Sequence, residues 1–202
     1  MNKLTPKAAY RKLAALYTRM GKAYDEAAQR VGLTCADCEN NCCTSYFQHH
    51  TYIEWAYLWQ GMNKLAPARR QEYLQRAEEY VARARQALAD GERPRIMCPL
   101  NDDGLCGLYE HRLMICRMHG VPNELVKPNG SRVRFAGCFR AQALTRDQDN
   151  VFVLDRTPLY RDLAQLEMSF LGSEMRRLAR VDLTLAEMLV SGPPPLHGPA
   201  GR

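Results

Sequence analysis

Eight cysteines carry the most specific chemical signal in this chain of 202 residues. Half of them lie in one short stretch that begins at Cys35 and reads C-A-D-C-E-N-N-C-C. The complete set is Cys35, Cys38, Cys42, Cys43, Cys98, Cys106, Cys116 and Cys138. Thiolates bind zinc, copper(I) and iron–sulfur clusters, and one Cys-x-x-Cys turn directs two sulfurs at one point. We therefore predict that this set of cysteines binds a metal ion or an iron–sulfur cluster, the alternatives being buried, inert thiols, disulfides or a redox dithiol such as Cys35 and Cys38.

The spacing favours an iron–sulfur cluster over zinc. Zinc modules usually carry two Cys-x-x-Cys-type knuckles, and this chain has one clear knuckle, at Cys35 and Cys38. With Cys42, these two form a compact run of three cysteines, which is typical of cluster proteins that add a distant ligand. We expect an iron–sulfur cluster of the 4Fe-4S type, with Zn²⁺ as the alternative.

The adjacent pair Cys42 and Cys43 gives information on how many metal positions the cysteines serve. Neighbouring residues in an extended chain point to opposite faces, so both can bind one tetrahedral ion only with strain. The pair indicates either two neighbouring metal positions or one ligand beside a thiol that does not bind metal. The sequence leaves both divisions open, and Cys43 is the residue whose role is least defined.

Histidines and arginines accompany the cysteines. His49, His50 and His119 could ligate a metal, donate to a sulfur or act as an acid or base near neutral pH, although a structural role is the ordinary one. The basic residues near the later cysteines are Arg112, Arg117, Arg132, Arg134 and Arg140. They would offset the charge of a thiolate-bound cluster or bind an anionic substrate. The alternative is an ordinary solvated surface.

The composition is that of a soluble globular protein, with 46% apolar and 25% charged residues and a net charge of +6. This mild charge does not indicate a nucleic-acid partner. Lysines and arginines interrupt the start of the chain, so no secretory signal is expected, and no run is apolar enough to span a membrane. We therefore expect a cytoplasmic protein, in which clustered thiols bind metal rather than form disulfides.

The pattern around the cysteines predicts a mainly α fold, with helices around an irregular cysteine-rich core. Apolar periodicity and capping signals predict helices at 6–31, 52–61, 67–90 and 157–180, with a last turn or two after Thr184. Thr51 with Glu54, and Thr184 with Glu187, match the capping-box pattern. We expect one domain over 1–190, with its cysteine core at 35–138, and a disordered tail at 191–202.

Between the helices, turn residues predict short β-hairpins. Asn-Asp-Asp-Gly separates Cys98 from Cys106, and Lys-Pro-Asn-Gly separates 125–126 from 133–135. A short helix is expected within 108–118, and a short strand at 151–154. Phosphate-loop, dinucleotide and nucleophile-elbow motifs are absent from the sequence.

The cysteine pattern resembles the YkgJ-like cysteine-cluster family, a group of zinc- or iron-chelating domains. The resemblance is carried by Cys35-x-x-Cys38-x-x-x-Cys42-Cys43, then by Cys98-Pro-Leu…Gly-x-Cys106, Cys116-Arg and Gly137-Cys138, and it covers roughly 30–140. Family members commonly have Arg-Pro where this chain has Arg112-Leu113. The resemblance implies that the eight cysteines are the metal ligands.

Three hypotheses about function follow. The first is an iron–sulfur protein with a redox or maturation role. The second is a structural zinc module that presents an interaction surface. The third is a small metal-dependent enzyme, such as a modification or methyl-transfer enzyme, with Cys43 or His119 beside the metal and Arg117 or Arg134 holding a substrate. The flagellin lysine methylase is related to the family, but this chain is short for its apparatus. The substrate and partner are unknown.

Overall fold

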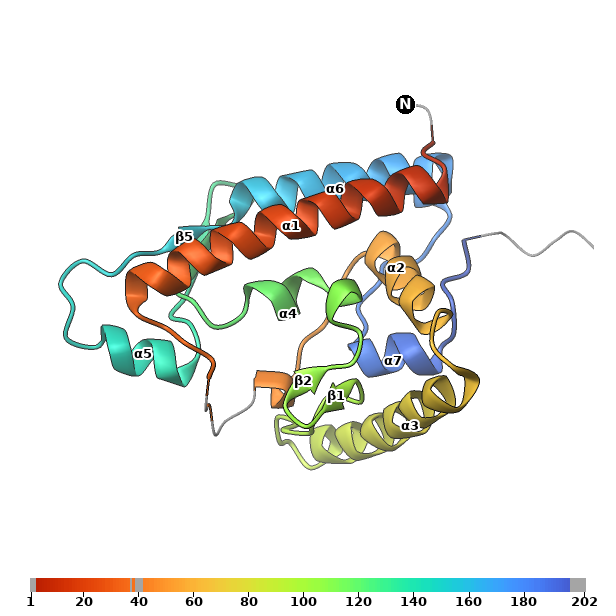
Figure 1. Ribbon diagram of the computed structural model, residues 1–202. Coiled ribbons are helices and arrows are strands. Elements are labelled where there is room, and N and C mark those ends of the chain that lie inside the picture. Colours follow the sequence, from red (N-terminus) through yellow and green to blue (C-terminus); the bar gives the residue numbers. More distant parts are fainter. Residues whose placement is uncertain (1–2, 37, 39–41, 197–202) are drawn as a thin grey trace, which may run out of the picture.

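The computed structural model describes residues 3–36, 38 and 42–196, and this part of the chain is mainly helical, as predicted. Figure 1 shows α1 and α6 side by side along one edge of the molecule, with α3 at the opposite edge. The helices are α1 (Pro6–Val31), α2 (Tyr52–Met62), α3 (Pro67–Ala89), α4 (Met114–Met118), α5 (Phe139–Thr145), α6 (Thr157–Leu171) and α7 (Leu185–Val190). No helix in these segments is long and apolar enough to cross a membrane.

Two small sheets lie between the helices. The strands are β1 (Asn101–Asp102), β2 (Leu105–Cys106), β3 (Asn123–Val126), β4 (Arg132–Phe135) and β5 (Leu154–Asp155). β1 and β2 form one antiparallel hairpin, and the second sheet has the order β4-β3-β5. Both predicted hairpins are confirmed. The strand expected at 151–154 is confined to Leu154 and Asp155, where it pairs in parallel with β3.

Helix α1 has the predicted bounds because its sequence defines both ends. The Thr5 hydroxyl oxygen accepts from Ala8 N at 3.3 Å. Gly32 ends the helix with φ of 70°, a left-handed conformation that glycine adopts without steric cost. The buried face, which includes Leu13, Tyr17 and Met20, packs on α6 and α4.

The capping box predicted at the start of α2 is wrong. Thr51 makes no side-chain bond to the helix backbone, and its hydroxyl donates to Glu54 Oε2 at 2.8 Å. Glu167 of α6 caps the helix instead, accepting from Tyr52 N at 2.8 Å and Ile53 N at 2.9 Å. The reason is that Glu54 turns into the core, where α1 and α4 supply stronger partners.

Glu167 makes stability depend on pH. Burial raises its pKa to about 7, although the two backbone N–H donors oppose the shift. Between its unfolded pKa, near 4.5, and about 7 the folded state therefore binds more protons than the unfolded state. We expect the free energy of unfolding to fall as pH rises through this window, by a few kcal/mol at most. Urea unfolding of Glu167→Gln should show less of this loss than the native chain, and an equal loss would contradict the assignment.

The C-terminal elements follow their sequence signals in part. α6 ends at Leu171 rather than near residue 180, because Gly172 takes φ of 57° and a 3-10 turn (Gly172–Arg176) follows. The capping box of α7 is present, with Glu187 N donating to Thr184 Oγ1 at 3.2 Å and Thr184 N donating to Glu187 Oε2 at 2.8 Å. α7 ends at Val190. Residues 191–196 of the predicted disordered tail are described and contact the core, since Trp55 Nε1 donates to Gly192 O at 2.8 Å and Leu196 packs on the apolar cluster, whereas residues 197–202 lie outside the described residues.

Candidate metal centre

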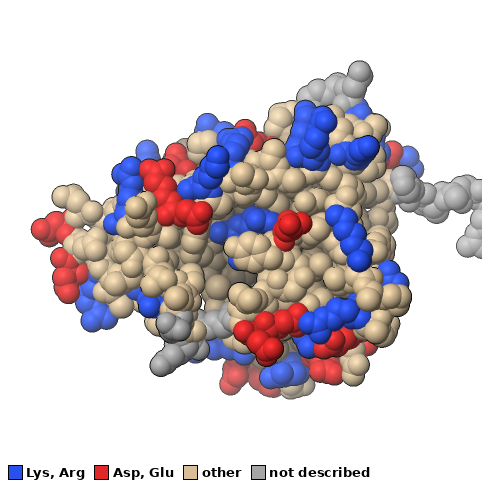
Figure 2. All heavy atoms as spheres, in the orientation of Figure 1, with Lys and Arg blue, Asp and Glu red and all other residues tan. Residues whose placement is uncertain are grey.

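All eight cysteines line one cavity of about 1280 Å³. They reach it from the segment after α1, the 3-10 turn Cys42–Thr44, the β1–β2 hairpin, α4 and the turn before α5. Figure 2 shows that this face of the molecule is hollowed near its middle. None of the eight is paired in a disulfide. Distant parts of the sequence thus converge on one space.

The thiols surround the cavity rather than forming a tight group. Within residues 3–36, 38 and 42–196, no three His, Cys, Asp or Glu side chains are close enough together to hold a metal ion. The donor set and its convergence fit a soft metal or an iron–sulfur cluster. If such a group binds here, the eight cysteines are the side chains that would hold it.

Backbone hydrogen bonds tie three cysteines together at the β1–β2 hairpin. Cys98 N donates to Cys43 O at 3.0 Å, so the 3-10 turn lies directly against the start of the hairpin. Asn101 N then donates to Cys98 O at 3.0 Å, and Asn101 pairs with Cys106 across the hairpin. Cys43, Cys98 and Cys106 therefore hold one another in place through the main chain.

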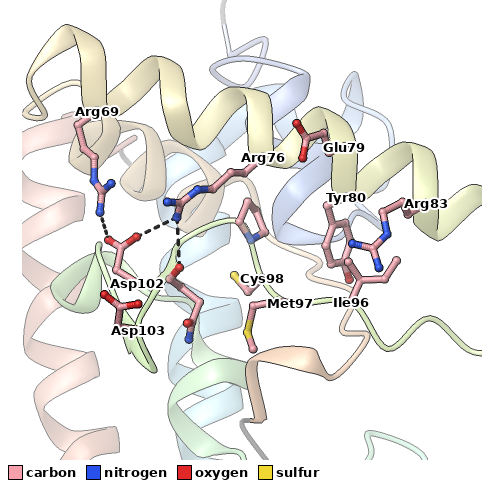
Figure 3. A pocket seen from close by; sticks show the side chains of 12 residues that line it. Arg69, Arg76, Glu79, Tyr80, Arg83, Ile96, Met97, Cys98, Asp102 and Asp103 are labelled. Atoms are coloured by element: carbon pink, nitrogen blue, oxygen red, sulfur yellow. Dashed lines mark hydrogen bonds and ion pairs between the residues drawn. The ribbon is translucent and has the colours of Figure 1, made fainter.

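Asp102 fixes this hairpin to α3. Its carboxylate accepts from Arg76 at 2.9 Å and from Arg69, as Figure 3 shows. It also accepts from the Tyr73 hydroxyl. A smaller cavity of about 370 Å³ lies on this side of Cys98, where Arg69 and Arg76 are already engaged by carboxylates. The ion pairs of Asp102 with Arg69 and Arg76 brace the cysteine hairpin against α3.

Disrupting this brace should loosen the hairpin. Asp102→Ala removes one acceptor of the Arg69 and Arg76 guanidinium groups and the acceptor of the Tyr73 hydroxyl. Asp103→Asn, at the exposed turn, leaves these bonds intact and keeps a side chain that tolerates the left-handed φ of 50° at that position. We expect the Asp102 variant to lose about 1–3 kcal/mol of stability and the Asp103 variant much less. Urea unfolding of both checks this, and equal losses would contradict the bracing role.

Cys116 enters the cavity from α4. Glu54 holds the first turn of this helix, since Met114 N donates to its Oε1 at 2.7 Å and the Tyr17 hydroxyl donates to the same oxygen at 2.8 Å. Glu54 itself is only 3% exposed. Burial raises the pKa of Cys116 to about 12, and the neighbouring charges of Cys106 and Cys43 add to the shift. Thiolates at this position need a positive charge nearby.

Arg112 supplies such a charge. It lines the same cavity, and its guanidinium lies 3.9 Å from the centre of the Tyr109 ring. Its positive charge favours the thiolate forms of Cys43, Cys106 and Cys116. Its Nε is buried and has no hydrogen-bond partner among the described residues. An anionic group in the cavity would satisfy this orphaned donor.

A second group of cysteines gathers at Tyr24 of α1. The Tyr24 hydroxyl lies 3.8 Å from Cys35 Sγ. Cys138 N donates to Gly120 O at 2.9 Å, and Gly120 lies so close to Tyr24 that an added Cβ would meet the hydroxyl. Burial, followed by the charges of Cys35, Cys42 and Cys138, raises the pKa of Tyr24.

The adjacent cysteines differ in environment. A hydrogen bond between the Cys42 and Cys43 thiols is the largest cause lowering the pKa of Cys43, which falls to about 6, and it raises that of Cys42. Cys43 is therefore the more readily ionised member of the pair, and thiolates are the metal-binding form.

The histidines divide between cavity and surface. His49 and His119 line the cavity; His49 is 2% exposed, and burial lowers its pKa to about 3. His119 packs edge-on against Phe47, with ring centres 4.9 Å apart. His50 faces Asp182 at 3.2 Å, outside the residues that line the cavity.

The arginines divide likewise. Arg112 and Arg117 line the cavity, and Arg140 donates to Ala36 O beside Cys35 at 2.8 Å. Arg132 and Arg134 instead pair with Glu124 on the outer hairpin, at 2.9 and 3.2 Å. No local pattern in the sequence marks Tyr24, Glu54 or Asp102 as a support of the cysteines, because each acts through partners from other elements of the fold.

No family model, curated protein or solved structure matches this chain in the comparisons made with each.

Proposed function

We propose that this chain is a cysteine-ligated iron–sulfur protein with a redox or maturation role. One observation carries the proposal, namely that eight cysteines from five separate segments line one cavity. Thiol side chains of a cytoplasmic protein would otherwise have no reason to converge in this way. The resemblance of the cysteine pattern to the YkgJ-like family supports the same conclusion.

The surroundings of the thiols suit a negatively charged cluster. Arg112 lines the cavity, where its Nε has no partner in the part of the chain that the structure describes, and Arg117 lies beside it. Cationic and N–H donor groups near thiolate-bound iron offset its charge and set its reduction potential. A bound cluster would supply one-electron chemistry, while the protein would hold it, partly shield it from water and fix its potential.

Anaerobic purification tests the proposal. We expect a brown protein with visible absorption that bleaches when a reductant is added, as the redox role requires. The structural zinc module makes the opposite prediction, namely a colourless protein that unfolds when zinc is chelated. A colourless anaerobic preparation with stoichiometric zinc would overturn the iron–sulfur proposal.

A small metal-dependent enzyme is the second candidate, and the shape of the cavity favours it. Beyond the thiols the cavity extends over Tyr57, Phe47 and Leu185, and its volume exceeds the range of about 300–1,000 Å³ that is usual for small-molecule pockets. A substrate could therefore lie beside the metal. Substitution of Cys43 with serine separates the roles, because a catalytic Cys43 predicts lost activity with metal retained, whereas a ligand predicts lost metal.

A further inference from the structure

The backbone contacts around the cavity separate the eight cysteines into two groups. Cys43 and Cys98 are joined by a main-chain hydrogen bond, and Cys106 is fixed to Cys98 through the β1–β2 hairpin. Cys35 and Cys138 are instead joined through Tyr24 and Gly120, on the side of α1. The two sets of contacts have no residue in common.

We infer that the cysteines form two separate four-thiolate sites, each of which takes its own iron–sulfur cluster. The hairpin site consists of Cys43, Cys98, Cys106 and Cys116. The Tyr24 site consists of Cys35, Cys38, Cys42 and Cys138. This inference rests on the proposed function for the identity of the cluster, but the division of ligands does not depend on which metal binds.

The electrostatic neighbours follow this division except at Cys42, whose thiol is affected by Cys43 and Cys116 as well as by Cys35. The charges of Cys43 and Cys106 act on Cys116 and on Cys98. The charges of Cys35, Cys42 and Cys138 act on Tyr24. Cys38 is assigned to the second group because it lies between Cys35 and Cys42 in the chain.

Burial and counter-charge also distinguish the sites. Cys98 and Cys116 are only partly exposed, and the positive charge of Arg112 acts on Cys43, Cys106 and Cys116. Cys35 and Cys42 are exposed. The two sites meet at the Cys42–Cys43 pair, whose thiols are hydrogen-bonded to each other.

The division is tested by single substitutions in the full chain, purified anaerobically and reconstituted with iron and sulfide. Cys106→Ala represents the hairpin site, Cys138→Ala the Tyr24 site, and Ser45→Ala, which changes a non-thiol residue lining the same cavity, is the matched control. We expect each cysteine variant to lose about half of the iron and half of the acid-labile sulfide, since four cysteines hold one cluster. The control should keep both.

Combined variants sharpen the test. Cys98→Ala with Cys106→Ala should lose no more iron than Cys106→Ala alone, whereas Cys106→Ala with Cys138→Ala should lose nearly all of it. Electron paramagnetic resonance of the reduced single variants should show two different signals that together account for the native spectrum. Circular dichroism verifies that each variant folds. If one does not, Cys98→Ala replaces Cys106→Ala for the hairpin site, and Cys35→Ala replaces Cys138→Ala for the Tyr24 site.

Two results would overturn the division. One is a folded single variant that loses all of its iron, and the other is a site whose variants keep all of it. If the native chain binds zinc and no sulfide, the proposed function fails, but the division is still decided, because each variant should then lose one of two zinc ions. Loss of both ions, or of neither, would refute it.

Discussion

Replacing Glu54 with alanine is expected to lower the free energy of unfolding by about 3–5 kcal/mol. The carboxyl group joins three elements in the core, since it accepts from Tyr17 of α1 and Met114 of α4 and bonds to Thr51 before α2. Alanine leaves a cavity and two buried donors, the Tyr17 hydroxyl and Met114 N, without their acceptor. Each orphaned donor costs about 1–3 kcal/mol.

Glutamine at the same position is the matched control. Its amide oxygen can accept from Tyr17 and Met114 while its NH₂ group donates to the Thr51 hydroxyl oxygen, so the loss should be about 1 kcal/mol. Urea unfolding of both variants under anaerobic conditions checks the prediction. Equal losses for alanine and glutamine would show that these hydrogen bonds do not carry the stability of the junction.

Substitution of Gly61 with alanine should destabilise the protein, whereas the same substitution at Gly21 should stabilise it. Both glycines lie inside helices, where alanine is intrinsically favoured by about 1 kcal/mol. A Cβ at Gly61 would lie 2.6 Å from His111 Cγ, and one at Gly21 meets nothing within 4 Å. The His111 ring is buried and stacked on Tyr57 at 4.5 Å, so it has little room to move.

We expect Gly61→Ala to lose about 1–3 kcal/mol net, as for other overpacked cores, and Gly21→Ala to gain about 1 kcal/mol. Thermal unfolding of the pair separates packing from helix propensity. If Gly61→Ala were as stable as Gly21→Ala, the close packing of α2 on the His111 segment would be disproved.

Local signals in the sequence predicted most elements of the fold. Thr5 and Gly32 define α1, and the Thr184–Glu187 capping box starts α7 as expected. The errors came from long-range contacts. Thr51 and Glu54 have the capping-box pattern, but Glu167, which follows them by more than a hundred residues, takes the backbone donors of α2. A capping-box pattern is defined by residues three positions apart, so it cannot predict that a distant residue such as Glu167 binds the same backbone N–H groups.

The cysteines of the candidate site could be singled out from the sequence, but the residues that support them could not. Thiol chemistry draws attention to the cysteines through their type and spacing, and all eight line one cavity; that they bind metal stays a prediction. Tyr24 and Asp102 are ordinary residues in the sequence. They acquire a role only through packing against Cys35 and against α3. The chain order likewise gives no means of dividing Cys42 from Cys43, which depends on the elements that approach each thiol.

The most direct test of the account is the content of iron, acid-labile sulfide and zinc in the full chain after anaerobic purification. We predict iron and sulfide in equal amounts, at the level of two clusters per chain, with little zinc. Zinc in stoichiometric amount without sulfide, or a folded protein that holds no metal after reconstitution, would contradict the central claim.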